Sequence, residues 1–174
     1  MPHVVTLGVV GFLAWLFVIS GVHKIRAPQI YAALLTRYLP RLPAAAPLAL
    51  CLGTVETFIG AGLLIPASRS AATLFAVILL LMYAGVMALQ LLRGQGDMRC
   101  GCGGADSDLL ISPLLVVRNL ICASLGAAAL LEPVRVAAGW PGVLMALCIT
   151  VFLVLMNLSA EQLIGNSQQL AEDL

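Results

Sequence analysis

Five apolar stretches, each long enough to cross a bilayer, constrain this 174-residue chain more than any other feature. A helix needs about 20 predominantly apolar residues to span the hydrocarbon core. A lipid-exposed segment of that kind satisfies its own backbone N–H and C=O groups by forming a helix. We therefore predict transmembrane helices at residues 4–22, 47–66, 71–92, 113–131 and 140–158.

The composition agrees with a membrane-embedded fold. Hydrophobic residues make up 61% of the chain and charged residues 10%, and the mean hydropathy is +1.06. Soluble proteins contain about 25% charged residues, so lipid must cover much of this apolar surface. We predict an all-α, five-helix bundle that forms a single membrane-embedded domain over residues 1–174. The first span lacks a basic flank and a cleavage site, so we expect it to be retained. The net charge of +1 gives no reason to expect nucleic acid as a partner.

The first connection, between residues 23 and 46, carries a helical pattern of its own. Prolines at positions 40 and 43 would end such a helix. A short amphipathic helix lying in the membrane interface fits this pattern, and an extension of the first span or an ordinary loop is the alternative. Its apolar side would consist of Ile30, Leu34, Leu35, Tyr38 and Leu42.

Two cysteines one residue apart, Cys100 and Cys102, lie in a glycine-rich loop before the fourth predicted span. A disulfide between them would close a small ring, and departures from ideal geometry make such a bond easier to reduce. Gly101 tolerates the backbone twist that closure requires. Arg99 favours the reactive thiolate, whereas Asp106 and Asp108 oppose it, so the sequence gives no net direction for this effect. We predict that Cys100 and Cys102 are catalytic redox residues. An incidental loop and half of a zinc site, with His23 as a third ligand, remain alternatives.

Two ionisable residues fall inside predicted spans, Glu56 in the second and Arg118 in the fourth. Both helices run inward from the cysteine-loop face, so we expect the two side chains to lie close together below the loop. An unpaired charge facing lipid costs at least about 3 kcal/mol. One interpretation is a salt bridge that joins two helices. The other is a polar pocket, with Asn119, for a membrane quinone or a proton path. Cys51 is a possible electron relay, or simply a buried cysteine.

Charge and chemistry disagree about the orientation. With five spans, the connections at 23–46 and 93–112 share one face with the C-terminus. The positive-inside rule would make that face cytoplasmic, whereas disulfides persist on the oxidising side. These two arguments leave the orientation open. The cysteine-loop face carries Lys24, Arg26, Arg37, Arg41, Arg93 and Arg99, and the other face carries Arg69 and Arg135.

Several of these features together resemble the MauE family of methylamine-utilisation proteins, part of the broader DoxX-like group. That group is distantly similar to vitamin K epoxide reductase bundles. The features are Gly21-Val22-His23-Lys24-Ile25 after the first span, Glu56 in the second, Cys100-Gly101-Cys102, and Arg118-Asn119 in the fourth. Gly103 stands where MauE-like sequences often have an aromatic residue, and the first connection lacks the cysteine pair of the epoxide reductases.

The resemblance implies a role in maturing the small subunit of methylamine dehydrogenase, a periplasmic protein rich in disulfides. It also implies a thioredoxin-like periplasmic partner of the MauD type and a location in a bacterial inner membrane. On this resemblance we expect the cysteine loop to be periplasmic, although the count of basic residues argues otherwise. Cys100 and Cys102 would then exchange disulfides with that partner, and a membrane quinone is the candidate electron acceptor. The alternative is a non-catalytic membrane anchor or assembly platform for periplasmic maturation factors, which needs no thiols.

Overall fold

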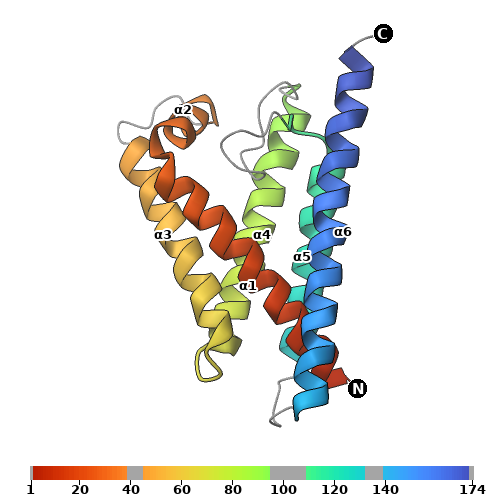
Figure 1. Cartoon of the computed structure of the whole chain (residues 1–174). Coiled ribbons are helices and arrows are strands. Elements are labelled where there is room, and N and C mark those ends of the chain that lie inside the picture. The colour runs from red at the N-terminus through yellow and green to blue at the C-terminus, as the bar shows by residue number, and fades with distance from the viewer. Residues whose placement is uncertain (1, 39–44, 95–108, 132–138, 173–174) are drawn as a thin grey trace.

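The computed structural model describes residues 2–38, 45–94, 109–131 and 139–172, and these form six helices (Figure 1). Their bounds are α1 Pro2–Arg26, α2 Pro28–Tyr38, α3 Ala45–Leu64, α4 Arg69–Leu92, α5 Pro113–Leu131 and α6 Trp140–Glu172. All except α2 are long and apolar enough to cross a membrane. The predicted class, a five-span helical bundle, is therefore confirmed.

Two of the spans are longer than the sequence pattern predicted. The first span ends at Arg26 rather than at residue 22, because nothing breaks the helix before Pro28. The last helix continues to Glu172 rather than ending at residue 158. Residues Glu161, Ile164 and Gln168 in this extension bond or pack against the segment around α5, which gives the added turns tertiary contacts.

The short helix predicted in the first connection is present as α2, and Pro28 occupies its first position, where proline fits best. This helix packs against α3. Its inward side differs in part from the predicted one, because Tyr31 is buried whereas Ile30 is 44% exposed. Leu34 and Leu35 face a cavity inside the bundle.

Helix α1 crosses the bundle diagonally and contacts α3, α5 and α6 (Figure 1). Helices α4 and α5 form a second closely packed pair. The main core joins one face of α1 to α3, α4 and α5, and its fully buried side chains include Leu13 and Leu63. Many large apolar side chains point outward from the spans, Phe58 and Phe152 among them, as expected for surfaces covered by lipid.

Glycines set the distance between α1 and α3. A Cβ atom on Gly53 would lie 2.9 Å from the carbonyl oxygen of Gly21, and one on Gly21 would lie 2.6 Å from the carbonyl oxygen of Gly53. The two backbones are thus in direct contact, as small residues permit in membrane helices. Lys24 and Glu56 each follow one of these glycines by three residues, so the crossing brings their side chains to the same level of the bundle.

The ends of the helices that flank residues 95–108 are tied to the rest of the fold. Helix α4 stops at Gly94, which adopts φ +72° and closes the last turn by donating its N–H to Leu91. On the other side, the Gln168 side chain on α6 bonds both backbone polar groups of Leu110, at 3.0 and 2.9 Å. Figure 1 shows these ends, α2 and the C-terminus at one end of the bundle, as the predicted topology requires.

We predict that Gly53→Ala destabilises the protein by about 1–3 kcal/mol, because the added methyl group forces α1 and α3 apart. The measurement is thermal or denaturant unfolding in detergent. Gly85→Ala is the matched control, because a Cβ atom added there would meet no neighbouring helix within 4 Å in the described part of the chain. That control should be neutral or stabilising by up to about 1 kcal/mol. Equal stability of the two variants would contradict the role assigned to the α1–α3 contact.

Candidate functional site

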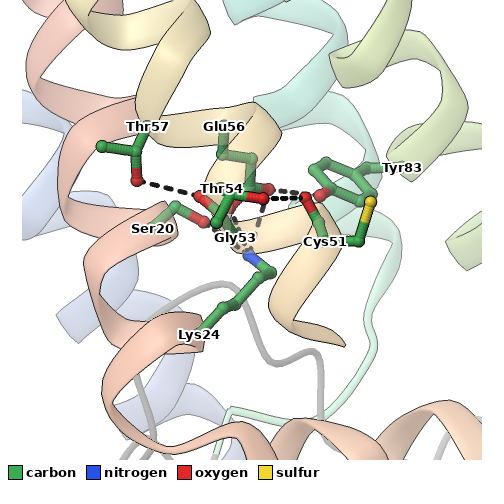
Figure 2. Close-up of polar contacts among 8 residues, drawn as sticks. All are labelled: Ser20, Lys24, Cys51, Gly53, Thr54, Glu56, Thr57 and Tyr83. Carbon is green, nitrogen blue, oxygen red and sulfur yellow. Dashed lines mark hydrogen bonds and ion pairs between the residues drawn. The ribbon is translucent and has the colours of Figure 1, made fainter. Parts of the chain in front are cut away.

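A buried ion pair between Lys24 on α1 and Glu56 on α3 is the centre of the polar interior (Figure 2). The Lys24 Nζ donates to both carboxylate oxygens of Glu56, at 2.8 and 3.0 Å, and to the hydroxyl of Ser20 at 2.7 Å. Tyr83 on α4 donates its hydroxyl to Glu56 from another side. Glu56 is completely buried and Lys24 is 6% exposed. Buried charges require this kind of pairing and hydrogen bonding.

Aromatic rings complete the surroundings of the Lys24 ammonium group. Its Nζ lies 5.3 Å from the ring centroid of Tyr31 and 5.6 Å from that of Tyr83, both within cation–π range. Tyr31 belongs to α2, so the short helix contributes to the surroundings of the ion pair. Helices α1, α2, α3 and α4 therefore meet at one cluster, which we call the lysine cluster: Ser20, Lys24, Tyr31, Glu56 and Tyr83.

A second ion pair joins α5 to α6. The guanidinium of Arg118 contacts the Glu161 carboxylate at 2.5 Å and donates through Nε to the side-chain oxygen of Asn157 at 2.8 Å. This finding corrects the expected salt bridge between Glu56 and Arg118. Each of the two residues has a nearer partner of opposite charge, on α1 for Glu56 and on the extended part of α6 for Arg118.

Both ion pairs line one partly open cavity of about 470 Å³, to which all six helices contribute residues. Its wall also includes Asn119, 5% exposed, and His23, whose buried Nδ1 has no hydrogen-bond partner in the described part of the chain. The rest of the lining is mainly apolar and aromatic, with Trp15, Phe17 and Met87 as examples. The predicted site residues Glu56, Arg118 and Asn119 are thus brought to the same cavity, although not into one ion pair.

The cysteines take different positions. Cys100 and Cys102 lie outside the described residues. Cys51 is exposed on α3 and is not among the residues that line the cavity. The bond from the Thr54 hydroxyl in Figure 2 is accepted by the backbone carbonyl of Cys51, not by its thiol. Cys122 is buried in the main core and Cys148 faces outward. Among the described residues, no group of three or more His, Cys, Asp and Glu side chains is arranged to hold a metal ion.

Several residues of the site were not predicted from the sequence. Lys24 was placed in the first connection, beyond a span that was drawn too short, and Glu161 lay beyond the predicted end of the last span. The signal for Lys24 was available, because Gly21 and Gly53 precede Lys24 and Glu56 at the same spacing. Tyr83 and Asn157 gave no comparable signal, since single polar side chains in apolar helices are common.

The chain is similar to known proteins over most of its length. The family described as "Methylamine utilisation protein MauE" matches residues 1–132. A protein of Paracoccus denitrificans described as "Methylamine utilization protein MauE" is 35% identical over 119 residues. That alignment covers 67% of this chain and 63% of the relative's length. No solved structure matches. The family match includes α1 to α5, and with them Lys24, Glu56, Tyr83, the cysteine pair and Arg118.

We predict that breaking the Lys24–Glu56 pair destabilises the fold strongly. Glu56→Gln and Lys24→Met should each cost about 3–5 kcal/mol in unfolding experiments in detergent, because each leaves a buried charge unpaired. The double variant should cost less than the sum of the two single variants, by roughly 1–3 kcal/mol. Arg37→Met, which removes an exposed cation from α2, is the control and should change stability by less than about 0.5 kcal/mol. Additive costs would show that the two side chains do not interact.

Proposed function

Because the chain belongs to the MauE family of methylamine utilisation proteins, we propose that it is a membrane thiol–disulfide redox protein acting through Cys100 and Cys102. Its role would be to form or correct disulfides in the small subunit of methylamine dehydrogenase. The observation that carries the proposal is the Cys100-Gly101-Cys102 sequence between α4 and α5, two helices that also line the polar cavity.

Three features support this assignment. A pair of thiols separated by one glycine favours a strained disulfide that exchanges readily. The described residues on either side of the cysteine segment have defined contacts, because Gly94 donates its N–H to Leu91 and the Gln168 side chain bonds Leu110. The three other cysteines lie within membrane helices, one buried and two facing outward, and offer no comparable pair.

In the oxidising direction the exchange is balanced as follows. Two thiols of the client lose two protons and two electrons and form one disulfide. The Cys100–Cys102 disulfide accepts them and becomes two thiols, either directly or through a thioredoxin-like periplasmic partner of the MauD type. A periplasmic position of the cysteine pair suits this chemistry, because disulfides persist in that compartment.

The positive-inside rule argues less strongly against a periplasmic cysteine pair than the sequence alone indicated, because one of the basic residues counted is buried. Lys24 is paired with Glu56 inside the bundle and does not contribute a free positive charge to a loop. The basic residues remaining on the cysteine-loop face are Arg26, Arg37, Arg41, Arg93 and Arg99.

We predict that Cys100→Ser and Cys102→Ser each reduce the maturation of methylamine dehydrogenase to the level of a strain lacking the gene. Each substitution removes one of the two sulfurs that the exchange requires. The measurement is dehydrogenase activity together with the redox state of the small subunit in the periplasm. Cys148→Ser is the control, because it removes an outward-facing thiol from a membrane helix, and it should retain full maturation.

Full maturation in both cysteine-loop variants would contradict the redox proposal. It would favour the second candidate function, a non-catalytic anchor for periplasmic maturation factors. That alternative uses the surfaces of the bundle but not its thiols.

A further inference from the structure

The charged groups that line the cavity are already paired with one another. A lysine ammonium group has three N–H donors, and Lys24 makes three hydrogen bonds, one to Ser20 and two to Glu56. Arg118 is matched by Glu161. Two cations therefore face two carboxylates. A charged ligand would add an unpaired charge to an apolar enclosure, which is energetically costly, so the cavity selects a neutral ligand.

Two polar side chains in the wall lack a protein partner. Asn119 is 5% exposed, and no hydrogen bond joins its side chain to another residue in the described part of the chain. The Nδ1 atom of His23 is buried and unpartnered within the same part. Buried polar groups are nearly always hydrogen-bonded. Asn119 and His23 are therefore the groups available to bond the polar atoms of a ligand.

The remainder of the cavity fixes the character of that ligand. Its volume of about 470 Å³ falls in the usual range for small-molecule sites. Its wall is built mainly from apolar side chains of membrane-spanning helices, with Trp15, Phe17 and Tyr83 supplying aromatic surface. A neutral, lipid-soluble molecule with an apolar ring and hydrogen-bonding oxygens meets all of these conditions.

We propose that this cavity binds the head group of a membrane quinone, with Asn119 and His23 as its hydrogen-bonding residues. The inference rests on the proposed function, which requires an acceptor for the electrons that reach Cys100 and Cys102. Oxidation of the two thiols breaks two S–H bonds, forms one S–S bond and releases two electrons and two protons. Reduction of a quinone to a quinol takes up the same two electrons and two protons and forms two O–H bonds.

The two hydrogen-bonding residues suit a ligand that changes between a carbonyl and a hydroxyl. The amide group of Asn119 donates to a carbonyl oxygen through its nitrogen and accepts from a hydroxyl through its oxygen. The Nδ1 atom of His23 donates or accepts, depending on the tautomer of the ring. Residues of fixed charge, such as Lys24 and Arg118, lack this ability and are engaged by carboxylates instead.

Trp15 provides a direct reporter of binding, because it lines the cavity, whereas the other tryptophan, Trp140, is 80% exposed at the start of α6. The experiment titrates decylubiquinone into the purified full chain carrying Trp140→Phe, in detergent, and follows the fluorescence of Trp15. We expect saturable quenching. In the same background, Asn119→Leu and His23→Leu should each raise the dissociation constant about five- to tenfold, which corresponds to one lost hydrogen bond.

Matched controls separate binding from partition of the quinone into micelles and from loss of the fold. Ser124→Ala changes an exposed polar side chain on the same helix as Asn119 and should leave the dissociation constant unchanged. A Trp15→Phe protein, which keeps only Trp140, should show weak quenching that does not saturate. The unfolding temperature of each variant shows whether it is folded, and Asn119→Gln should restore part of the affinity if Asn119→Leu loses it.

Non-saturating quenching of Trp15, or equal affinities for the original protein and a folded Asn119→Leu variant, would overturn the inference. The cysteine variants distinguish this result from failure of the proposed function. Cys100→Ser and Cys102→Ser should bind decylubiquinone normally while blocking maturation. If the cysteine variants block maturation but no saturable binding exists, the thiol function stands and the quinone inference fails.

Discussion

The buried pair between Lys24 and Glu56 is the interaction on which one end of the bundle depends. A charge on either helix alone would be costly inside a membrane, and together they hold α1 against α3. Tyr83 extends the same network to α4, and Tyr31 brings α2 over it. The contact between the Gly21 and Gly53 backbones makes this geometry possible, because any side chain there would separate the helices. The close packing of α1 on α3 and the pairing of Lys24 with Glu56 therefore depend on each other.

The consequence for function is a polar interior in a protein whose membrane spans present many large apolar side chains outward. One ion pair joins α1 to α3 and the other joins α5 to α6, so the charges of these four cavity-lining side chains cancel. Residues of α4 and α5, the two helices that the cysteine segment joins in the sequence, are among those that line the cavity. We propose that membrane-linked disulfide chemistry uses both this cavity, for a neutral lipid-soluble ligand, and the thiol pair of Cys100 and Cys102.

Much of the fold followed from the sequence because hydrophobic length alone specifies a membrane helix. All five spans and the short helix after α1 were predicted, and the errors concern where α1 and α6 end. Those errors have one cause. Charged residues such as Lys24 and Glu161 were treated as ends of spans, whereas both are neutralised by partners inside the bundle. The partners come from other helices, and one sequence does not specify which helices are neighbours.

The candidate site was predicted only in part, because one sequence does not specify which helices are neighbours. Glu56 and Arg118 were identified because charged residues in apolar spans are costly, and Asn119 because it follows Arg118; the structure brings all three to one cavity. Their individual partners required the three-dimensional arrangement. The possible relay residue Cys51 faces outward from α3 and does not line the cavity.

The most direct test of the account is the location and redox state of the cysteine pair in the cell. Intact spheroplasts would be treated with a membrane-impermeant maleimide before and after reduction, and labelled peptides identified by mass spectrometry. The account predicts that Cys100 and Cys102 are labelled from outside only after reduction, as an accessible periplasmic disulfide requires. Labelling only after the membrane is broken, with no reduction needed, would place free thiols in the cytoplasm and contradict the account.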